Sequence, residues 1–373
     1  MALLAGATTG LYTIAPPQEA SAEISDKFRM EINGYQQYVV DNDGVGFKYY
    51  DSNGKRKSNY WSNQTRLVIS YHLDKNVKMQ ARLHNNYDNV GDFMKNQNDT
   101  GAFFDQTFLE IKDPVAKTTY TIGKKGAYMG QGMVYNSTGN LTGVAVQVGD
   151  WWAPNNIAVY YGDRKNGDRI KAVNGHVGLG KKVDFSVLYL DAVKSRSYFT
   201  PYTYVDTKGK TYHTVGSDRV YDNTRAYTNY ALNGEGTYRK LHILSYGTKV
   251  KFPEVTLVGE YSHNLNGEGL DHDTLKGWYA ELYTGPTTDM TSGLPLCKPG
   301  TNVWSLKYQD IGKNSVYTHN PTFVDDMKGW RLTYGHTFRK GLSTDFAWGH
   351  YERKSTGEKN RDIYVAELAY KFR

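Results

Sequence analysis

The chain has few residues that could cross-link it and no segment that could form a membrane helix. Its 373 residues include one cysteine, Cys297, so an intramolecular disulfide cannot form. It has no run of 18 apolar residues, which excludes a transmembrane helix on hydropathy. The mean hydropathy of −0.65 resembles that of a soluble protein. A strand that faces lipid on one side, however, needs apolar residues only at alternate positions. A membrane protein built from strands therefore remains open.

Sequence motifs for catalysis and metal binding are also lacking. Residues 175–182 nearly match a phosphate-binding loop, but Lys182 stands where Ser or Thr must bind magnesium, and a predicted strand follows. The ten histidines show no metal-ligand spacing. Asp345 and His350 would point to opposite faces of one strand. We therefore expect no enzyme activity, no metal and no cofactor. The formal charge of +7 is spread without a basic stripe, which argues against nucleic acid as a partner.

The dominant pattern is alternation of apolar and polar side chains in segments of about ten residues. In the last segment, one face carries Tyr364, Ala366, Leu368, Tyr370 and Phe372, and the other face carries Glu367 and Lys371. The same period of two recurs from about residue 27 onward. We count about sixteen strands, with 14–18 as the range. Their connectors alternate between short and long, except that 284–302 is long where a short turn is expected.

These features predict an all-β protein, a closed antiparallel transmembrane β-barrel. So many consecutive up-and-down strands exceed what an open twisted sheet usually reaches, and closure removes the edge strands. Aromatic residues near strand ends, such as Trp151 and Trp278, favour lipid as the outer environment. We expect the last strand, 364–372, to close the barrel against 29–39.

The first 22 residues differ from the rest of the chain. The start is apolar, and Ala20-Ser-Ala22 has the form of a signal-peptidase site. We interpret residues 1–22 as an export signal peptide and residues 23–373 as a single barrel domain. A disordered N-terminal tail is the alternative.

With its export signal, its alternating strands and its ending Tyr370-Lys-Phe372, the chain resembles a bacterial outer-membrane porin. The resemblance implies a place in the outer membrane of a diderm bacterium, contact with its lipid, and often a homotrimer. It also implies that the barrel-assembly machinery reads Tyr370 and Phe372 as an assembly signal. The final Arg373 departs from the usual aromatic ending.

A barrel of this width leaves an aqueous channel, and its selectivity depends on the residues that face the lumen. We expect passive diffusion of small hydrophilic solutes or ions. Either a mild preference for anions or an unselective polar wall would fit the nearly balanced charges. The alternating register predicts that the pore is lined by Arg29, Glu31, Arg66, Lys78, Arg82, Lys112, Glu260 and Arg331.

Two segments are candidates for narrowing the pore. The resemblance implies a constriction loop early in the chain, and we assign it to 123–140, with Lys124, Lys125, Tyr128 and Tyr135. An ordinary extracellular loop is the alternative reading of this segment. The tyrosine-rich 193–236 segment is the other candidate. A different class of function stays open too: a binding or adhesion barrel that acts through its long extracellular loops.

Overall fold

The computed structural model describes residues 26–41, 59–88, 102–149, 155–163, 169–180, 182–195, 203–205, 211–215, 218–221, 238–266, 272–312, 314–317, 323, 326–354 and 361–372. The proposed export signal lies outside these residues. Within them, no helix is long and apolar enough to cross a membrane.

Sixteen of the strands in the described residues form one closed antiparallel barrel, which confirms the predicted fold class and strand number. Each barrel strand pairs with its neighbours in chain order. The barrel strands are β1 (Phe28–Asp41), β2 (Asn59–His72), β3 (Val77–Asp88), β4 (Phe103–Asp113), β5 (Thr118–Met129), β6 (Tyr135–Val148), β7 (Asn156–Asp163), β8 (Arg169–Leu179), β9 (Val183–Ser195), β13 (Tyr238–Lys251), β14 (Val255–Asn264), β15 (Lys276–Thr284), β16 (Asn302–Ile311), β17 (Met327–Arg339), β18 (Leu342–Arg353) and β19 (Arg361–Phe372).

A separate three-stranded sheet lies within the connector between β9 and β13. It consists of β10 (Thr203–Val205), β11 (Thr211–Val215) and β12 (Asp218–Tyr221). Two short 3-10 helices, η3 (His272–Thr274) and η4 (Leu294–Leu296), lie in other connectors.

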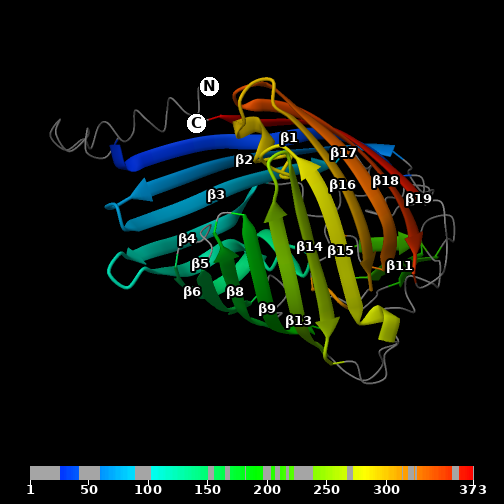
Figure 1. Cartoon of the computed structure of the whole chain (residues 1–373), viewed down its shortest axis with the longest axis horizontal. Coiled ribbons are helices and arrows are strands. Elements are labelled where there is room, and N and C mark those ends of the chain that lie inside the picture. Colours follow the sequence, from blue (N-terminus) through cyan, green and yellow to red (C-terminus); the bar gives the residue numbers. More distant parts are fainter. Residues whose placement is uncertain are drawn as a thin grey trace.

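The barrel closes where the last strand pairs with the first (Figure 1). The ladder runs from Ile32 opposite Phe372 to Asp41 opposite Ile363, as expected from the sequence. Tyr370 reinforces this seam, because its ring passes over Gly34 of β1. Its hydroxyl lies 2.7 Å from Oγ1 of Thr65 on β2. One side chain thus ties three adjacent strands together.

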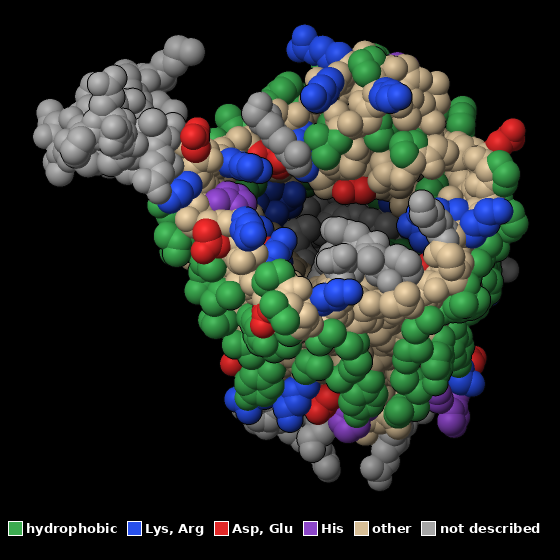
Figure 2. All heavy atoms as spheres, turned by 60° about the vertical axis from the view of Figure 1, so that its left-hand side comes forward, with side chains coloured by type: hydrophobic (Ala, Val, Ile, Leu, Met, Phe, Trp, Pro, Cys, Tyr) green, Lys and Arg blue, Asp and Glu red, His purple; other side chains and the backbone are tan. Residues whose placement is uncertain are grey.

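The two faces of the wall have the reverse of the polarity found in a water-soluble sheet. In β16, Trp304 and Leu306 point outward and are 50% and 52% exposed. Between and beyond them, Ser305 and Lys307 point inward and are each 4% exposed. Figure 2 shows hydrophobic side chains covering much of the outer wall in that view, below a hollowed mouth that is flanked by charged side chains. The alternation therefore places the apolar face outside and the polar face inside.

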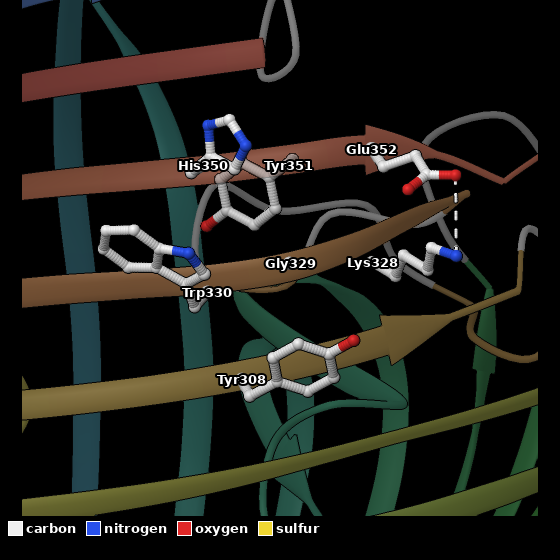
Figure 3. A pocket seen from close by; sticks show the side chains of 7 residues that line it. All are labelled: Tyr308, Lys328, Gly329, Trp330, His350, Tyr351 and Glu352. Atoms are coloured by element: carbon white, nitrogen blue, oxygen red, sulfur yellow. Dashed lines mark ion pairs between the residues drawn. The ribbon is translucent and has the colours of Figure 1, made fainter. Parts of the chain in front are cut away.

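Aromatic side chains gather on the outer wall near both rims. Near the short-turn rim, the rings of Trp304 and Tyr334 lie 4.5 Å apart. Near the other rim, the rings of Trp330 and Trp348 meet edge to face at 4.3 Å. Figure 3 shows Tyr308, Trp330 and His350 beside an outer-wall pocket, with the Lys328–Glu352 ion pair (3.5 Å) at its end. Aromatic belts of this kind mark the levels at which a membrane meets water.

The connectors follow the predicted short–long alternation with two departures. Five turns at one rim are short, namely 73–76, 114–117, 180–182, 252–254 and 340–341. The 285–301 connector lies at this same rim, so the strand register around it was right and the turn itself is elaborated. The expected loop 123–140 is mostly strand, because β5 extends to Met129 and β6 begins at Tyr135. Only Gly130–Val134, which we call the β5–β6 tip, lie between the two strands.

The seam generates a prediction about Gly34. A Cβ atom there would lie 1.9 Å from the carbonyl oxygen of Gln64 and 2.7 Å from the hydroxyl of Tyr370. We expect Gly34→Val to destabilise the barrel by about 1–3 kcal/mol, the usual cost of overpacking. Heat-modifiable migration on a gel, recorded against temperature, should show the folded band lost at a lower temperature.

Gly175→Val on β8 is the matched control for this substitution. A Cβ atom at Gly175 would have its nearest neighbour, the carbonyl oxygen of Asn156, at 3.9 Å. Equal transition temperatures for the two variants would contradict the role given to the seam.

Candidate functional site

Charged side chains on the inner wall of β2 to β4 form a compact network. Arg82 donates two hydrogen bonds to Asp105, from Nε at 2.7 Å and from Nη2 at 2.5 Å. The Nδ1 atom of His84 lies 2.8 Å from the same carboxylate. Arg66 lies opposite His84 in the ladder and is also buried. This part of the wall therefore holds two arginines and one carboxylate, and its net charge is positive.

A second inner-wall cluster surrounds Glu110 on β4. Lys125 Nζ donates to Oε2 at 2.8 Å, and Lys78 Nζ lies 3.5 Å from Oε1. The Lys125 ammonium also lies over the Phe108 ring, 4.8 Å from its centroid, which is favourable for a cation. Two lysines and one carboxylate give this cluster a formal charge of +1.

The β5–β6 tip folds into the barrel and is held there by Glu260 of β14. Oε2 of Glu260 accepts hydrogen bonds from the backbone N–H groups of Gln131 (3.1 Å) and Met133 (2.9 Å). Oε1 accepts a hydrogen bond from the hydroxyl of Ser245. Glu260 is 3% exposed, and a buried carboxylate is tolerable only when its oxygens are hydrogen-bonded. The tip and the buried charge therefore stabilise each other.

Further hydrogen bonds fasten the tip to other strands. Gly130 N–H donates to Oδ1 of Asn174 on β8 at 2.8 Å. The hydroxyls of Tyr128 and Tyr279 both donate to the Gln131 carbonyl, at 2.5 and 3.0 Å. Contacts to β5, β8, β14 and β15 hold the tip on several sides of the lumen.

Two glycines allow the tip to fit so closely. Gly130 has φ +62°, and a Cβ atom there would lie 2.3 Å from Oε1 of Glu260. Gly132 has φ +89°, and a Cβ atom there would lie 2.3 Å from the Tyr128 ring. Both positions require the left-handed backbone that glycine adopts without strain.

Beneath the tip, the inner wall is apolar. Met129, Met133, Val134 and Tyr135 are fully buried. The Tyr135 ring stacks on Tyr317 at 5.5 Å. The facing wall of β7 to β9 and β13 contributes Tyr160, Ile170, Ala172, Leu188, Leu190, Ala192, Leu241 and Ile243. Hydrophobic packing against β7 to β9 and β13 thus fixes one side of the tip.

The structure separates the predicted site residues into several groups. Arg66, Lys78 and Arg82 lie on the charged inner wall described above. Glu31 pairs with Lys371 at 3.4 Å. Arg29 and Lys112 lie near the short-turn rim and are exposed, and Arg331 lies inward on β17 and is half-buried. Glu260 needs a correction, because it faces inward but is covered by the tip and does not line open lumen.

The residues assigned to the constriction loop are also divided. Lys124 and Lys125 belong to β5, where Lys124 Nζ donates to the carbonyl of Phe104 at 3.1 Å. Tyr128 and Tyr135 flank the tip. The residues that anchor the tip, Asn174 and Glu260, cannot be recognised as its anchors from the sequence pattern.

One sequence signal could have located the covered wall. Val187 and Tyr189 point outward while Leu188 and Leu190 point inward and are buried. A strand that is apolar on both faces needs cover on its inner side as well. This run in β9 therefore indicates that something folds against it inside the barrel.

No protein-family model and no curated protein match the sequence. Solved structures do match in fold. OprB of Pseudomonas putida, in a high-pH structure, aligns with a TM-score of 0.56 at 9% identity over 95% of this chain and 96% of that one. OmpF of Salmonella typhi, in complex with daunomycin, gives a TM-score of 0.52 at 11% identity over 92% and 97%. A mutant porin of Rh. blastica gives 0.51 at 12% identity over 92% and 100%. The chain therefore has a porin-type barrel fold.

The anchoring of the tip predicts the effect of removing Glu260. Glu260→Ala leaves the N–H groups of Gln131 and Met133 without their acceptor, at a cost of about 1–3 kcal/mol for each buried group. We expect the tip to leave the wall while the barrel stays closed. Limited proteolysis should then cut between Met129 and Tyr135.

Glu254→Ala is the control, because Glu254 is exposed in the turn between β13 and β14. Resistance of Glu260→Ala to cleavage, equal to that of Glu254→Ala, would refute the anchoring role.

Proposed function

We propose that the chain forms a water-filled channel in a bacterial outer membrane, through which small hydrophilic solutes diffuse passively. The observation that carries this proposal is the reversed polarity of the closed wall. Its outer face is apolar and bordered by aromatic side chains, which suits lipid, while its inner face is charged and polar, which suits water. The porin-type fold supports the same conclusion.

Passive diffusion fits the construction of the interior. Sixteen strands enclose more space than side chains of the wall can fill. Figure 2 shows the mouth of this space at the short-turn rim. The β5–β6 tip narrows the lumen from one side, so we infer that it acts as the constriction. Tyr128 and Tyr135, at the two ends of the tip, help to hold it in place.

A mild preference for anions follows from the charges on the inner wall of β2 to β5. On β2 to β5, the cations are Arg66, Lys78, Arg82 and Lys125, and the carboxylates of the two clusters are Asp105 and Glu110. Four positive charges against two negative ones favour anions in a narrow passage. The excess is small, so we propose a weak selectivity and not a binding site.

The C-terminal end of β19 supports a role in assembly. Tyr370 and Phe372 lie on the outer face, with their rings stacked at 6.1 Å. We propose that the barrel-assembly machinery recognises this aromatic end of the last strand. Homotrimer formation stays a prediction of the resemblance.

One observation favours a second function, a binding or adhesion barrel. The long connector between β9 and β13 contains the β10–β12 sheet, which gives this connector its own scaffold. A loop with internal structure can present a defined surface to a partner. Such a protein would not require an open lumen.

Conductance across a planar lipid bilayer distinguishes the two functions. The purified, folded chain should produce large, stable conductance steps that persist at either sign of voltage. Under a salt gradient, the reversal potential should give an anion-to-cation permeability ratio of about 1.5 to 3. A closed bilayer containing folded barrel would exclude the channel and favour the binding function. A ratio below one would refute the anion preference alone.

A further inference from the structure

The turn between β15 and β16 enters the lumen at the rim opposite the long loops. It comprises residues 285–301, whereas 340–341 makes the next turn at the same rim. Its middle carries η4, with Leu294 and Pro295 buried. A solvent-exposed hairpin loop would not bury these two residues. The turn is therefore packed against other parts of the barrel.

The packing surface is the inner wall of β17. Gly335 leaves a gap in the row of inward side chains, and a Cβ atom there would lie 2.6 Å from Cδ2 of Leu294 and 2.8 Å from Sδ of Met290. Met290 and Leu294 therefore occupy the space that a side chain at 335 would take. Thr337 Oγ1 donates to the Leu294 carbonyl at 2.9 Å, which fixes η4 to the same strand.

Further hydrogen bonds hold the turn across neighbouring strands. Gly341 N–H donates to the Pro295 carbonyl at 2.8 Å. Thr291 Oγ1 donates to Oε1 of Glu367 on β19 at 2.7 Å. The other oxygen of Glu367 accepts from Nε2 of Gln37 on β1 at 2.9 Å. This turn thus links inner-wall groups of β1, β19 and β17.

The turn also places a carboxylate in the lumen. Asp289 is exposed, and its Oδ1 accepts from the backbone N–H of Ser292 at 2.8 Å, which fixes its orientation. The adjacent Met290 packs against Gly335 of the inner wall, so the carboxylate lies on the part of the turn that enters the lumen.

We propose that the β15–β16 turn forms a second narrow point of the channel, at which the exposed carboxylate of Asp289 sorts solutes by charge. The proposal rests on the channel function proposed above. It places a selectivity element at the short-turn mouth, in series with the β5–β6 tip. Small solutes fit this element, and Asp289 weakens the preference for anions that the cations of β2 to β5 set, because its carboxylate repels anions.

Shortening the turn tests the steric part of the proposal. In this variant, a two-residue Asn-Gly turn replaces residues 285–301, and heat-modifiable migration verifies closure of the barrel. Two narrow points of similar resistance lie in series, so removing one raises the single-channel conductance by at most roughly twofold. We expect a rise close to that limit. Unchanged conductance overturns the second constriction and leaves the channel function intact, whereas a wild-type chain that does not conduct overturns both.

Charge removal tests the role of Asp289 without altering the turn. Asp289→Asn keeps an oxygen that can accept from Ser292 N–H, so the local fold is preserved. We expect the anion-to-cation permeability ratio, measured as a reversal potential, to rise about twofold. Asp113→Asn removes the same charge at the same rim and also keeps its turn acceptor, since Oδ1 of Asp113 accepts from Val115 N–H at 2.9 Å. Equal ratios in the two variants overturn the proposal.

Cys297 provides a measurement that does not depend on conductance. It is the only cysteine of the chain and lies in the turn, and burial raises the pKa of its thiol. Gly335→Val fills the gap that receives Met290 and Leu294, so the turn should detach and Cys297 should react several-fold faster with a water-soluble maleimide. Gly175→Val is again the control. Equal rates in the two variants contradict the docking on which the second constriction depends.

Discussion

Pairing of the last strand with the first is the constraint on which the rest of the structure depends. The ladder runs from Ile32–Phe372 to Asp41–Ile363. Without it, β1 and β19 would present free N–H and C=O groups that hydrocarbon cannot satisfy. Gly34 and Tyr370 show how tightly the sequence specifies the closure, because the ring can cross β1 only where a side chain is missing. Once the barrel is closed, its outer face needs only apolar side chains. All further specificity has to come from inside.

Two buried carboxylates organise the interior in the same way. Glu260 accepts hydrogen bonds from the β5–β6 tip and from Ser245 of the wall. Glu367 accepts one from Thr291 of the β15–β16 turn and one from Gln37 of the wall. In each case, an inward segment supplies donors to a charge that would otherwise be costly to bury. The lumen is thus shaped by segments whose position and whose buried anchor depend on each other.

The sequence allowed prediction of the barrel because lipid and water impose a period of two on every strand. Strand number, closure and the inward direction of Arg66, Lys78 and Arg82 follow from that period. The anchors could not be predicted in this way, because Glu260 lies far along the chain from the tip that it binds. For the same reason, the sequence shows that 285–301 is longer than expected, but it does not show that this turn docks against Gly335. Alternation specifies the face of a residue and not the segment that covers it.

Swelling of liposomes that contain the folded chain tests the central claim most directly, since it measures passage of uncharged solutes through the lumen. In an isosmotic series of sugars, the account predicts swelling that is fast for pentoses, slower for hexoses and very slow for trisaccharides, without saturation at high concentration. This size dependence follows from a water-filled lumen narrowed by inward segments. Liposomes that stay unswollen in pentoses, although the barrel is folded and inserted, would contradict it.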